Sequence, residues 1–294
     1  MPRAPLPAIA GSFLVPWLLL ASPAAAEDSP GGSASPTSKK GYHLFRPTPT
    51  ALLREMSTDR PDLTESPHTV DAGHVQIELE ATHFSRDRAG NEESDEVGAL
   101  GPNLKLGLLP QVDLQLGCVG GAWQSTKEPG APEVDESGVG HTYVRVKWNL
   151  WGNDGGPTAL ALMPFVTLPT GSDGLSGEVV EPGLIVPFGW AWPAGFDFGS
   201  MVQVDWVEDA DEEGRHAEWL TTATVGHALA GSLGAFLEFA AATRPAAEGE
   251  WIGTVDLGLV FAATPNVQLD GGAILGVSDA ADGLGLFLGL SIRR

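Results

Sequence analysis

The sequence predicts an all-β protein, a transmembrane antiparallel up-and-down β-barrel of about 12 strands. First, apolar and polar residues alternate with a period of two from about Gly73 to the C-terminus, as in strands with one apolar face. Second, no stretch after Ala26 reaches 18 consecutive apolar residues, so a membrane-spanning chain would have to close its sheet into a barrel. Third, short turns alternate with longer acidic connections, which is typical of outer-membrane barrels.

The chain begins with a segment typical of an export signal. Arg3 supplies a positive start, residues 9–20 are mainly apolar, and residues 24–26 are three alanines that form a small-residue cleavage site. Pro16 interrupts the apolar stretch, which disfavours a membrane-anchoring helix. The residues that follow are rich in Ser, Pro and Gly. We expect a signal peptide over 1–26, a flexible leader over 27–55, an N-terminal periplasmic motif segment over 56–72 and the barrel over 73–294.

The first alternating run shows the strand pattern most clearly. Val75, Ile77 and Leu79 fall on one face, whereas Glu78 and Glu80 fall on the other. At about 3.3 Å per residue and a tilt near 45°, a run of about 12 residues covers the roughly 25 Å apolar band of an outer membrane. The predicted strands are 73–84, 96–108, 111–123, 139–151, 157–168, 178–188, 195–207, 216–228, 233–243, 250–263, 266–277 and 282–292.

The predicted connections fall into two classes that alternate along the chain. The short turns would face the periplasm and the longer, mostly acidic connections would face outward, which places both ends of the barrel chain on the periplasmic side. The short turns are 109–110, 152–156, 189–194, 229–232 and 264–265. The longer connections are 85–95, 124–138, 169–177, 208–215, 244–249 and 278–281.

Tryptophans are expected to form two rims, because amphipathic rings prefer the two interfaces of a membrane. Those near predicted outer strand ends are Trp123, Trp206, Trp219 and Trp251, and those near inner ends are Trp148, Trp151, Trp190 and Trp192. The alternative is that these rings fill the core of a soluble β protein. A soluble barrel of twelve strands is hard to fill with side chains, which favours the membrane interpretation.

Acidic residues dominate the composition. The 38 Asp and Glu residues outnumber the 16 Lys and Arg residues, and the formal charge of −22 argues against nucleic-acid binding. Cys118 is the only cysteine, which excludes an internal disulfide and a thiolate metal cage. The sequence contains no calcium-loop spacing, phosphate loop or dinucleotide fingerprint. We therefore expect no metal and no cofactor.

One segment is a specific family signal. Residues 57–67 read STDRPDLTESP, residues 73–78 read GHVQIE, and residues 168–171 read LPTG. Together they resemble the barrel family named "putative MetA-pathway of phenol degradation", whose members are usually called outer-membrane transporters. The resemblance implies a barrel in the outer membrane of a Gram-negative-type bacterium. It also implies outer-membrane lipid, small-molecule solutes and the barrel-assembly machinery as partners.

The polar residues of this signal are candidate site residues. They are Thr58, Asp59, Arg60, Pro61, Asp62, Thr64, Glu65 and Ser66. The two prolines favour extended structure, and the short polar side chains favour local hydrogen bonds. One hypothesis is that the segment folds at the periplasmic mouth and constricts or plugs the lumen, with Arg60 paired bidentately to a carboxylate. The other is that it caps backbone groups at the barrel rim.

The function predicted from this pattern is an outer-membrane channel or transporter for small solutes, with hydrophobic or aromatic molecules as the class that the family name suggests. Inward polar side chains leave a hydrated path whose charges tune selectivity. The candidates for lumen lining are Glu78, Glu80, Asp113, Arg145, Lys147, Asp205, Glu238 and Asp256. Acidic residues outnumber basic ones in this set, which predicts a modest preference for cations or neutral solutes.

Two other functions stay open. A barrel can be structural or adhesive without transporting anything, and some outer-membrane barrels are hydrolases. His74, His141 and His216 fall on predicted polar faces, but no Gly-x-Ser-x-Gly elbow accompanies them. No catalytic residue is therefore assigned, and we predict that the protein is not an enzyme.

Overall fold

The computed structural model describes residues 39–89, 92–127, 130, 132–172, 177–209, 214–243 and 251–294. It contains fourteen strand segments and two short 3-10 turns, η1 (Thr50–Leu52) and η2 (Pro193–Gly195). The first seven strands are β1 (Val75–Ala89), β2 (Glu92–Leu109), β3 (Val112–Cys118), β4 (Gly121–Lys127), β5 (Val134–Val139), β6 (Thr142–Trp151) and β7 (Thr158–Leu168). The others are β8 (Glu181–Trp192), β9 (Phe196–Glu208), β10 (Arg215–Ala230), β11 (Leu233–Thr243), β12 (Trp251–Thr264), β13 (Val267–Gly276) and β14 (Leu284–Arg293).

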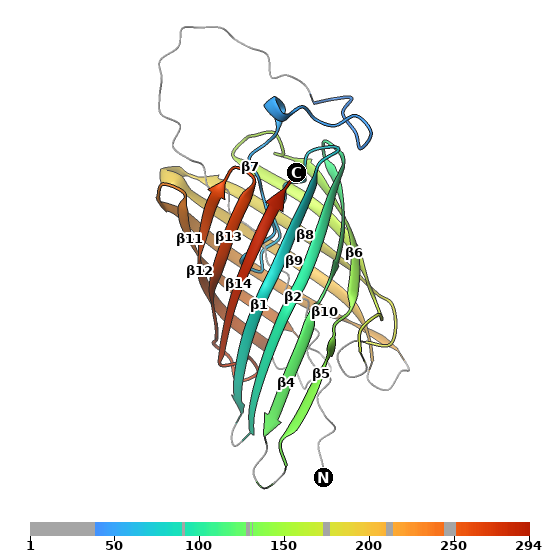
Figure 1. Cartoon of the computed structure of the whole chain (residues 1–294), viewed down its shortest axis with the longest axis vertical. Helices are drawn as coiled ribbons and strands as arrows, with labels where there is room; N and C mark the ends of the chain where they lie inside the picture. The colour runs from blue at the N-terminus through green and yellow to red at the C-terminus, as the bar shows by residue number, and fades with distance from the viewer. Residues whose placement is uncertain are drawn as a thin grey trace.

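The strands close into an antiparallel barrel, since β1 pairs with β14 on one side and with β2 on the other (Figure 1). β3 and β4 pair in succession with the same strand β2, so they are two halves of one barrel strand. β5 and β6 pair with β4 and β3 in the same way. The fourteen segments therefore form twelve barrel strands, which confirms the predicted fold and strand number. Among the described residues, no helix is long and apolar enough to cross a membrane.

The strand bounds differ from the predicted ones mainly at the outer end. The predicted connection 85–95 is largely strand, because the β1–β2 ladder continues to the pair Ala89 and Glu92; within it, Arg86 Nε donates to Asp95 at 2.6 Å. The predicted connection 124–138 contains most of β5, and the predicted turn 189–194 contains the end of β8. The cause is cross-strand pairing, which sequence alternation alone does not reveal.

The outer surface of the barrel is apolar and the inner surface is polar. Outward side chains such as Ile77, Leu116 and Leu288 are 46–58% exposed, whereas Glu78 and Lys105 on the inner face are buried. All eight tryptophans outside the predicted signal peptide are 39–56% exposed, so they do not fill a core. An apolar belt with exposed aromatic rims is what lipid requires of a barrel. The protein therefore spans an outer membrane.

The C-terminus and the short turns lie at one end of the barrel, drawn at the top of Figure 1, and this is the periplasmic end by the rule for turn lengths. Residues 39–55, the described part of the predicted leader, lie there. Arg54 donates to the Pro110 carbonyl at 3.0 Å, and Arg293 at the end of β14 donates to the Arg54 carbonyl at 2.8 Å. Hydrogen bonds to the rim therefore position this part of the leader. The predicted signal peptide, 1–26, lies outside the described residues.

Candidate functional site

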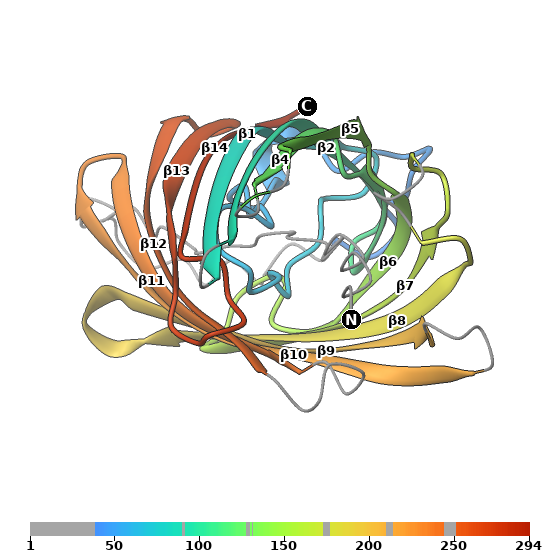
Figure 2. The same cartoon turned by 90° about the horizontal axis from the view of Figure 1, so that it is seen from below.

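Residues 57–72, hereafter the lumen segment, lie inside the barrel. Seen along the barrel, Figure 2 shows the blue-to-cyan early chain within the ring of strands. Every residue from Thr58 to Pro67 is buried. The segment lies further inside than the periplasmic mouth at which we expected it, since it contacts Glu238 in the middle of β11. Its polar groups need partners on the inner wall, because unpaired buried polar groups are costly.

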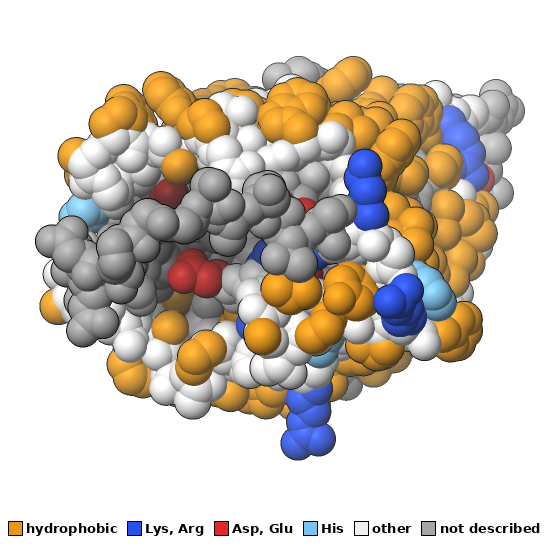
Figure 3. Space-filling model, turned by 90° about the horizontal axis from the view of Figure 1, so that it is seen from above, with side chains coloured by type: hydrophobic (Ala, Val, Ile, Leu, Met, Phe, Trp, Pro, Cys, Tyr) orange, Lys and Arg blue, Asp and Glu red, His pale blue; other side chains and the backbone are white. Residues whose placement is uncertain are grey.

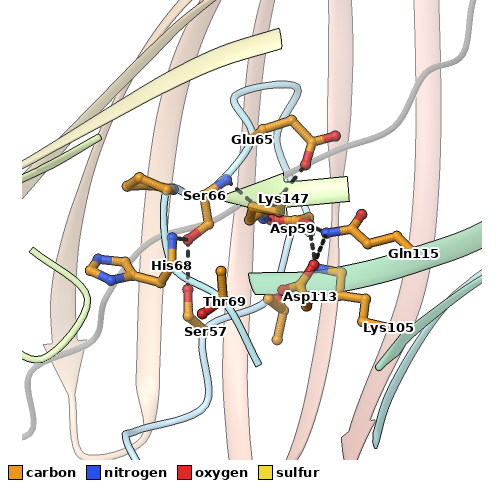
Figure 4. A network of polar contacts seen from close by, with 12 residues as sticks. Ser57, Asp59, Glu65, Ser66, His68, Thr69, Lys105, Asp113, Gln115 and Lys147 are labelled. Carbon is orange, nitrogen blue, oxygen red and sulfur yellow. Dashed lines mark hydrogen bonds and ion pairs between the residues drawn. The ribbon is translucent and has the colours of Figure 1, made fainter. Parts of the chain in front are cut away.

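Asp59 is the centre of a buried polar network (Figure 4). Lys147 Nζ lies 2.5 Å from its Oδ1, and Lys105 Nζ pairs with its Oδ2. The Ser66 amide donates to Oδ1 at 3.1 Å and Gln115 Nε2 donates to Oδ2 at 3.3 Å. Burial favours the neutral carboxyl, but the two ammonium groups outweigh it and keep the pKa of Asp59 well below its usual range. One carboxylate thus binds two strands through two cations.

β1 binds the backbone next to this carboxylate. The Asp59 amide donates to both oxygens of Glu78 at 2.9 Å, and Lys105 Nζ lies 2.5 Å from Glu78 Oε1. Gln76 Nε2 donates to Glu78 and to the Ser57 carbonyl, both at 2.8 Å. The start of the lumen segment is therefore bound to β1 and β2 through its side chains and its backbone.

Arg60 pairs with a carboxylate on β13. Its Nη2 and Nε lie 2.9 and 3.2 Å from Asp270 Oδ1, and its Nη1 lies 3.8 Å from Glu80 Oε2. The guanidinium rests against Gly289 of β14, where any Cβ would overlap it. Both members of the Arg60–Asp270 pair are buried. Such a pair fixes position well, because an Arg fork is rigid and directional.

Glu238 on β11 accepts three hydrogen bonds from the lumen segment. The amides of Leu63 and Thr64 donate to it at 2.5 and 2.8 Å, and Thr64 Oγ1 donates at 2.5 Å. The same hydroxyl lies 2.6 Å from Thr222 Oγ1 on β10. One carboxylate thus accepts hydrogen bonds from two successive backbone amides of the segment, which have no partner in a strand or helix.

Glu65 pairs with Arg145 on β6, whose Nη1 lies 2.7 Å from Glu65 Oε1. The Arg145 guanidinium stacks over the Tyr143 ring at 4.2 Å and lies 5.5 Å from the Phe165 ring centroid. Such stacking orients a guanidinium and adds a cation–π attraction. On the other side, the Glu65 amide lies 3.3 Å from Met201 Sδ on β9.

The remaining motif residues are bound within the segment itself or have no partner. Thr58 Oγ1 donates to the Arg60 carbonyl at 3.0 Å, and Ser66 Oγ lies 2.7 Å from Ser57 Oγ. Pro61 is buried as well. Neither carboxylate oxygen of Asp62 has a hydrogen-bond partner among the described residues. Burial raises the pKa of Asp62 well above its usual range, and the neighbouring Glu238 raises it further.

The raised pKa of the buried Asp62 carboxyl predicts that docking of the lumen segment weakens as pH rises. Asp62 has a higher pKa in the docked segment than in a segment released into water. Protonation therefore stabilises the docked state fully at pH values below the ordinary carboxyl pKa of about 4. This stabilisation is lost as pH rises through the raised pKa of the docked carboxyl. We expect channel conductance to increase with pH in the unaltered protein, and Asp62→Asn to remove this step. Asp279→Asn, at an exposed outer position, should keep it. An unchanged pH profile in Asp62→Asn would contradict the prediction.

The predicted lining residues divide into two groups. Glu78, Asp113, Arg145, Lys147 and Glu238 contact the lumen segment directly; Asp113, for example, accepts from the Val70 amide at 3.0 Å. Asp256 is buried on β12 opposite Glu238, whereas Glu80 reaches the segment only through the 3.8 Å Arg60 contact. Asp205 is bound instead by Gln203 on its own strand, at 2.8 Å. Their role in lining a conducting path stays a prediction.

Sequence reasoning missed several partners of the segment. Lys105, Gln115 and Asp270 all bind it, and Asn149 donates to the Pro67 carbonyl at 2.8 Å. Each alternates with outward apolar residues, so the period-two pattern contained the signal. Pairing across the lumen could not be inferred, because it joins residues as far apart as Arg60 and Asp270.

A cavity of about 700 Å³ opens at the periplasmic end beside the lumen segment. Lys39, Arg54, Thr64 to Thr69 and the starts of β7 and β9 line it. At its edge, Asp71 pairs with Lys39 at 3.0 Å and with Arg54 at 3.1 Å. The space-filling view of this end (Figure 3) shows orange hydrophobic side chains on the outer flanks and red acidic side chains in the central hollow. The mouth thus carries both polar and apolar side chains inside an apolar outer wall.

Comparison with known proteins places this geometry in a family. In structure, the chain is similar to the COG4313 outer membrane channel from Pseudomonas putida F1, with a TM-score of 0.57, 14% identity, and coverage of 81% of this chain and 100% of that one. It is also similar to the NanC porin, with a TM-score of 0.47, 9% identity, and coverage of 74% and 98%. No curated protein matches it in sequence. Residues 58–293, from the lumen segment to the last strand, match the family described as "Putative MetA-pathway of phenol degradation", and the chain belongs to that family.

Proposed function

We propose that the protein is an outer-membrane channel for small solutes and that the lumen segment controls its conduction. The observation that supports this most strongly is the wall inside the barrel, where polar and charged side chains from seven strands bind one segment through hydrogen bonds and ion pairs. Polar contacts can be exchanged for water at low net cost, because water satisfies the same groups. A lumen closed in this way can open without exposing an apolar core.

The solute class is part of the proposal. The family name links the chain to phenol degradation, so small hydrophobic or aromatic molecules are the class we propose. The inner wall supports this class where buried apolar side chains form the cluster Met163–Phe165–Ile185–Met201. An inner wall of mixed character suits solutes with an apolar body and few polar groups.

The charges toward the outer end predict cation preference. Glu80, Asp205 and Glu218 lie on or beside the inner face, on the outer side of the lumen segment. The predicted lining set contains six acidic and two basic residues. Carboxylates in a pore raise the local cation concentration. Reversal potentials in a salt gradient should show cation selectivity of about a few-fold, and Asp205→Asn should reduce it. Asp279→Asn is the control, and anion selectivity of the unaltered protein would contradict the prediction.

We propose no catalytic activity. His74 Nε2 contacts the Thr48 carbonyl at 2.8 Å, and both ring nitrogens of His216 face carboxylates, Asp209 at 2.7 Å and Glu218 at 3.4 Å. Neither arrangement places a serine hydroxyl next to a histidine base. An esterase assay together with a serine-reactive probe tests this, and labelling that an excess of ester substrate prevents would overturn it.

A structural barrel without transport is the second candidate, and the buried lumen segment favours it. The experiment that separates the two is conductance of purified, refolded protein in planar bilayers. Discrete current steps that a lipid-only bilayer lacks would support a channel. Their absence at every voltage and pH, in protein whose folding is confirmed by heat-dependent gel migration, would support a structural barrel.

A further inference from the structure

The polar contacts of the lumen segment are one-sided. Side chains of β1, β2, β3, β6, β10, β11 and β13 bind it. Within the described part of the chain, no hydrogen bond or ion pair joins the segment to β7 or β8, and β9 contributes only Met201 Sδ, 3.3 Å from the Glu65 amide. A thioether is a weak acceptor. The segment can therefore leave this side of the wall with little loss of hydrogen bonding.

Between Asp197 at the mouth and Gln203 further out, the wall on this side is apolar, and it is built from small residues at the periplasmic end. Ala159 and Ala161 are buried on the inner face of β7, and Gly189 and Gly199 occupy the facing positions of β8 and β9. The segment lies close to the two glycines: a Cβ at Gly189 would be 3.2 Å from the Pro67 ring, and a Cβ at Gly199 would be 3.1 Å from Thr64. Beyond them, Met163, Ile185 and Met201 form a buried apolar cluster with Phe165. We call the strip between this wall and the segment the β7–β9 slot.

The slot continues the periplasmic cavity. Ala159, Gly189 and Gly199 line the 700 Å³ cavity, and so do Thr64 and Pro67 of the segment. Met201 and Met163 follow further from the mouth along the same strands. The cavity thus ends where the apolar cluster begins, and the closed part of the slot is the contact between that cluster and the segment.

The outer end of the slot is closed by the Glu65–Arg145 pair. Arg145 stacks on Tyr143 and Phe165. Each ring occupies the space beside a glycine of the neighbouring strand, Gly117 and Gly183, where a Cβ would overlap the ring. The rings are thereby kept against the wall. Moving one ion pair, Glu65–Arg145, would connect the slot to the outer lumen.

We propose that solutes pass the lumen segment through the β7–β9 slot, with Met163, Ile185 and Met201 as the residues that select them and the Glu65–Arg145 pair as the outer gate. This rests on the proposed channel function. Thioether and aliphatic side chains attract apolar surfaces by dispersion, and they offer no strong hydrogen-bond partner to polar groups. The slot therefore selects small molecules with an apolar body over sugars and ions of similar size.

The test places a label in the slot and on a matched wall. In a Cys118→Ala background, Met163→Cys is compared with Val260→Cys, which is also buried and inward-facing but lies on β12. Each variant is labelled in denaturant with benzyl methanethiosulfonate, refolded, checked by heat-dependent gel migration, and measured in planar bilayers with phenol and glucose as probes. We expect the label at 163 to lower the current about five-fold and to remove the interruptions that phenol causes. The label at 260 should change the current less than about two-fold.

A second pair of variants guards against misfolding of labelled protein. Met163→Gln keeps the length of the side chain but adds an amide, and should shorten phenol interruptions about ten-fold, whereas Val260→Thr should leave them unchanged. Equal effects at 163 and 260 in a conducting protein would overturn the slot and leave the channel function intact. No current in any unlabelled form would instead overturn the channel function itself.

Discussion

Replacing Asp59 with Asn is expected to release the lumen segment from the wall. The change leaves the buried Lys105 and Lys147 without the carboxylate that both contact. Removing one partner of a buried ion pair costs about 3–5 kcal/mol, and here two cations lose the same partner. Docking should therefore weaken by a large factor, and the two lysines should become hydrated. Limited proteolysis of residues 57–72 and conductance in planar bilayers measure the change, and both should rise.

A double variant separates loss of the pair from loss of the fold. Asp59→Asn combined with Lys147→Met removes the cation that loses its closest carboxylate, whereas Lys105 still pairs with Glu78, so part of the docking should return. The barrel itself should keep its heat-dependent gel migration in all forms, because its strand ladder does not involve Asp59. A segment that stays resistant to protease in Asp59→Asn alone would show that this network does not determine docking.

Adding one methyl group at Gly289 is expected to have nearly the effect of removing Arg60. A Cβ at Gly289 would overlap the Arg60 guanidinium, so Gly289→Ala should displace Arg60 from Asp270. Leaving Asp270 buried and unpaired costs several kcal/mol by the same reasoning as above. Conductance should increase in Gly289→Ala and in Arg60→Ala. The double variant should add little to either, since both remove one interaction.

Gly101→Ala is the matched control for this change. A Cβ at Gly101 would meet its nearest neighbour, the Cys118 carbonyl, at 3.5 Å, which is ordinary van der Waals contact. The same substitution on another inner-facing glycine should therefore leave conductance unchanged. Equal conductance changes in Gly289→Ala and Gly101→Ala would show that the Arg60 position is unimportant.

Much of the fold could be predicted because a strand in lipid has a strict period of two. All twelve predicted strands correspond to barrel strands, and their alternation also gave the direction of Glu78, Lys147 and Glu238. Breaks within strands could not be predicted. β3 and β4 separate at Val119–Gly120 beside Leu100, whose φ of 62° is unusual for a residue with a side chain and is not indicated by the local sequence.

The candidate site could be predicted in part. The motif identified the residues of the lumen segment. The pairing of Arg60 with a carboxylate was one of two hypotheses, and it did not name the carboxylate. That partner, Asp270, is 210 residues away, and the depth of the segment depends on such long-range pairs. Local propensity does not determine them. The apolar β7–β9 slot could not be predicted from the sequence either, because it depends on which strands form few polar contacts with the segment.

The most direct test of the central claim compares single-channel conductance of the refolded protein with and without residues 27–71. If the lumen segment closes the channel, the deletion should give larger current steps, and titrating back a peptide of residues 39–72 should reduce them. Steps of the same size in both forms would contradict the claim that this segment controls conduction.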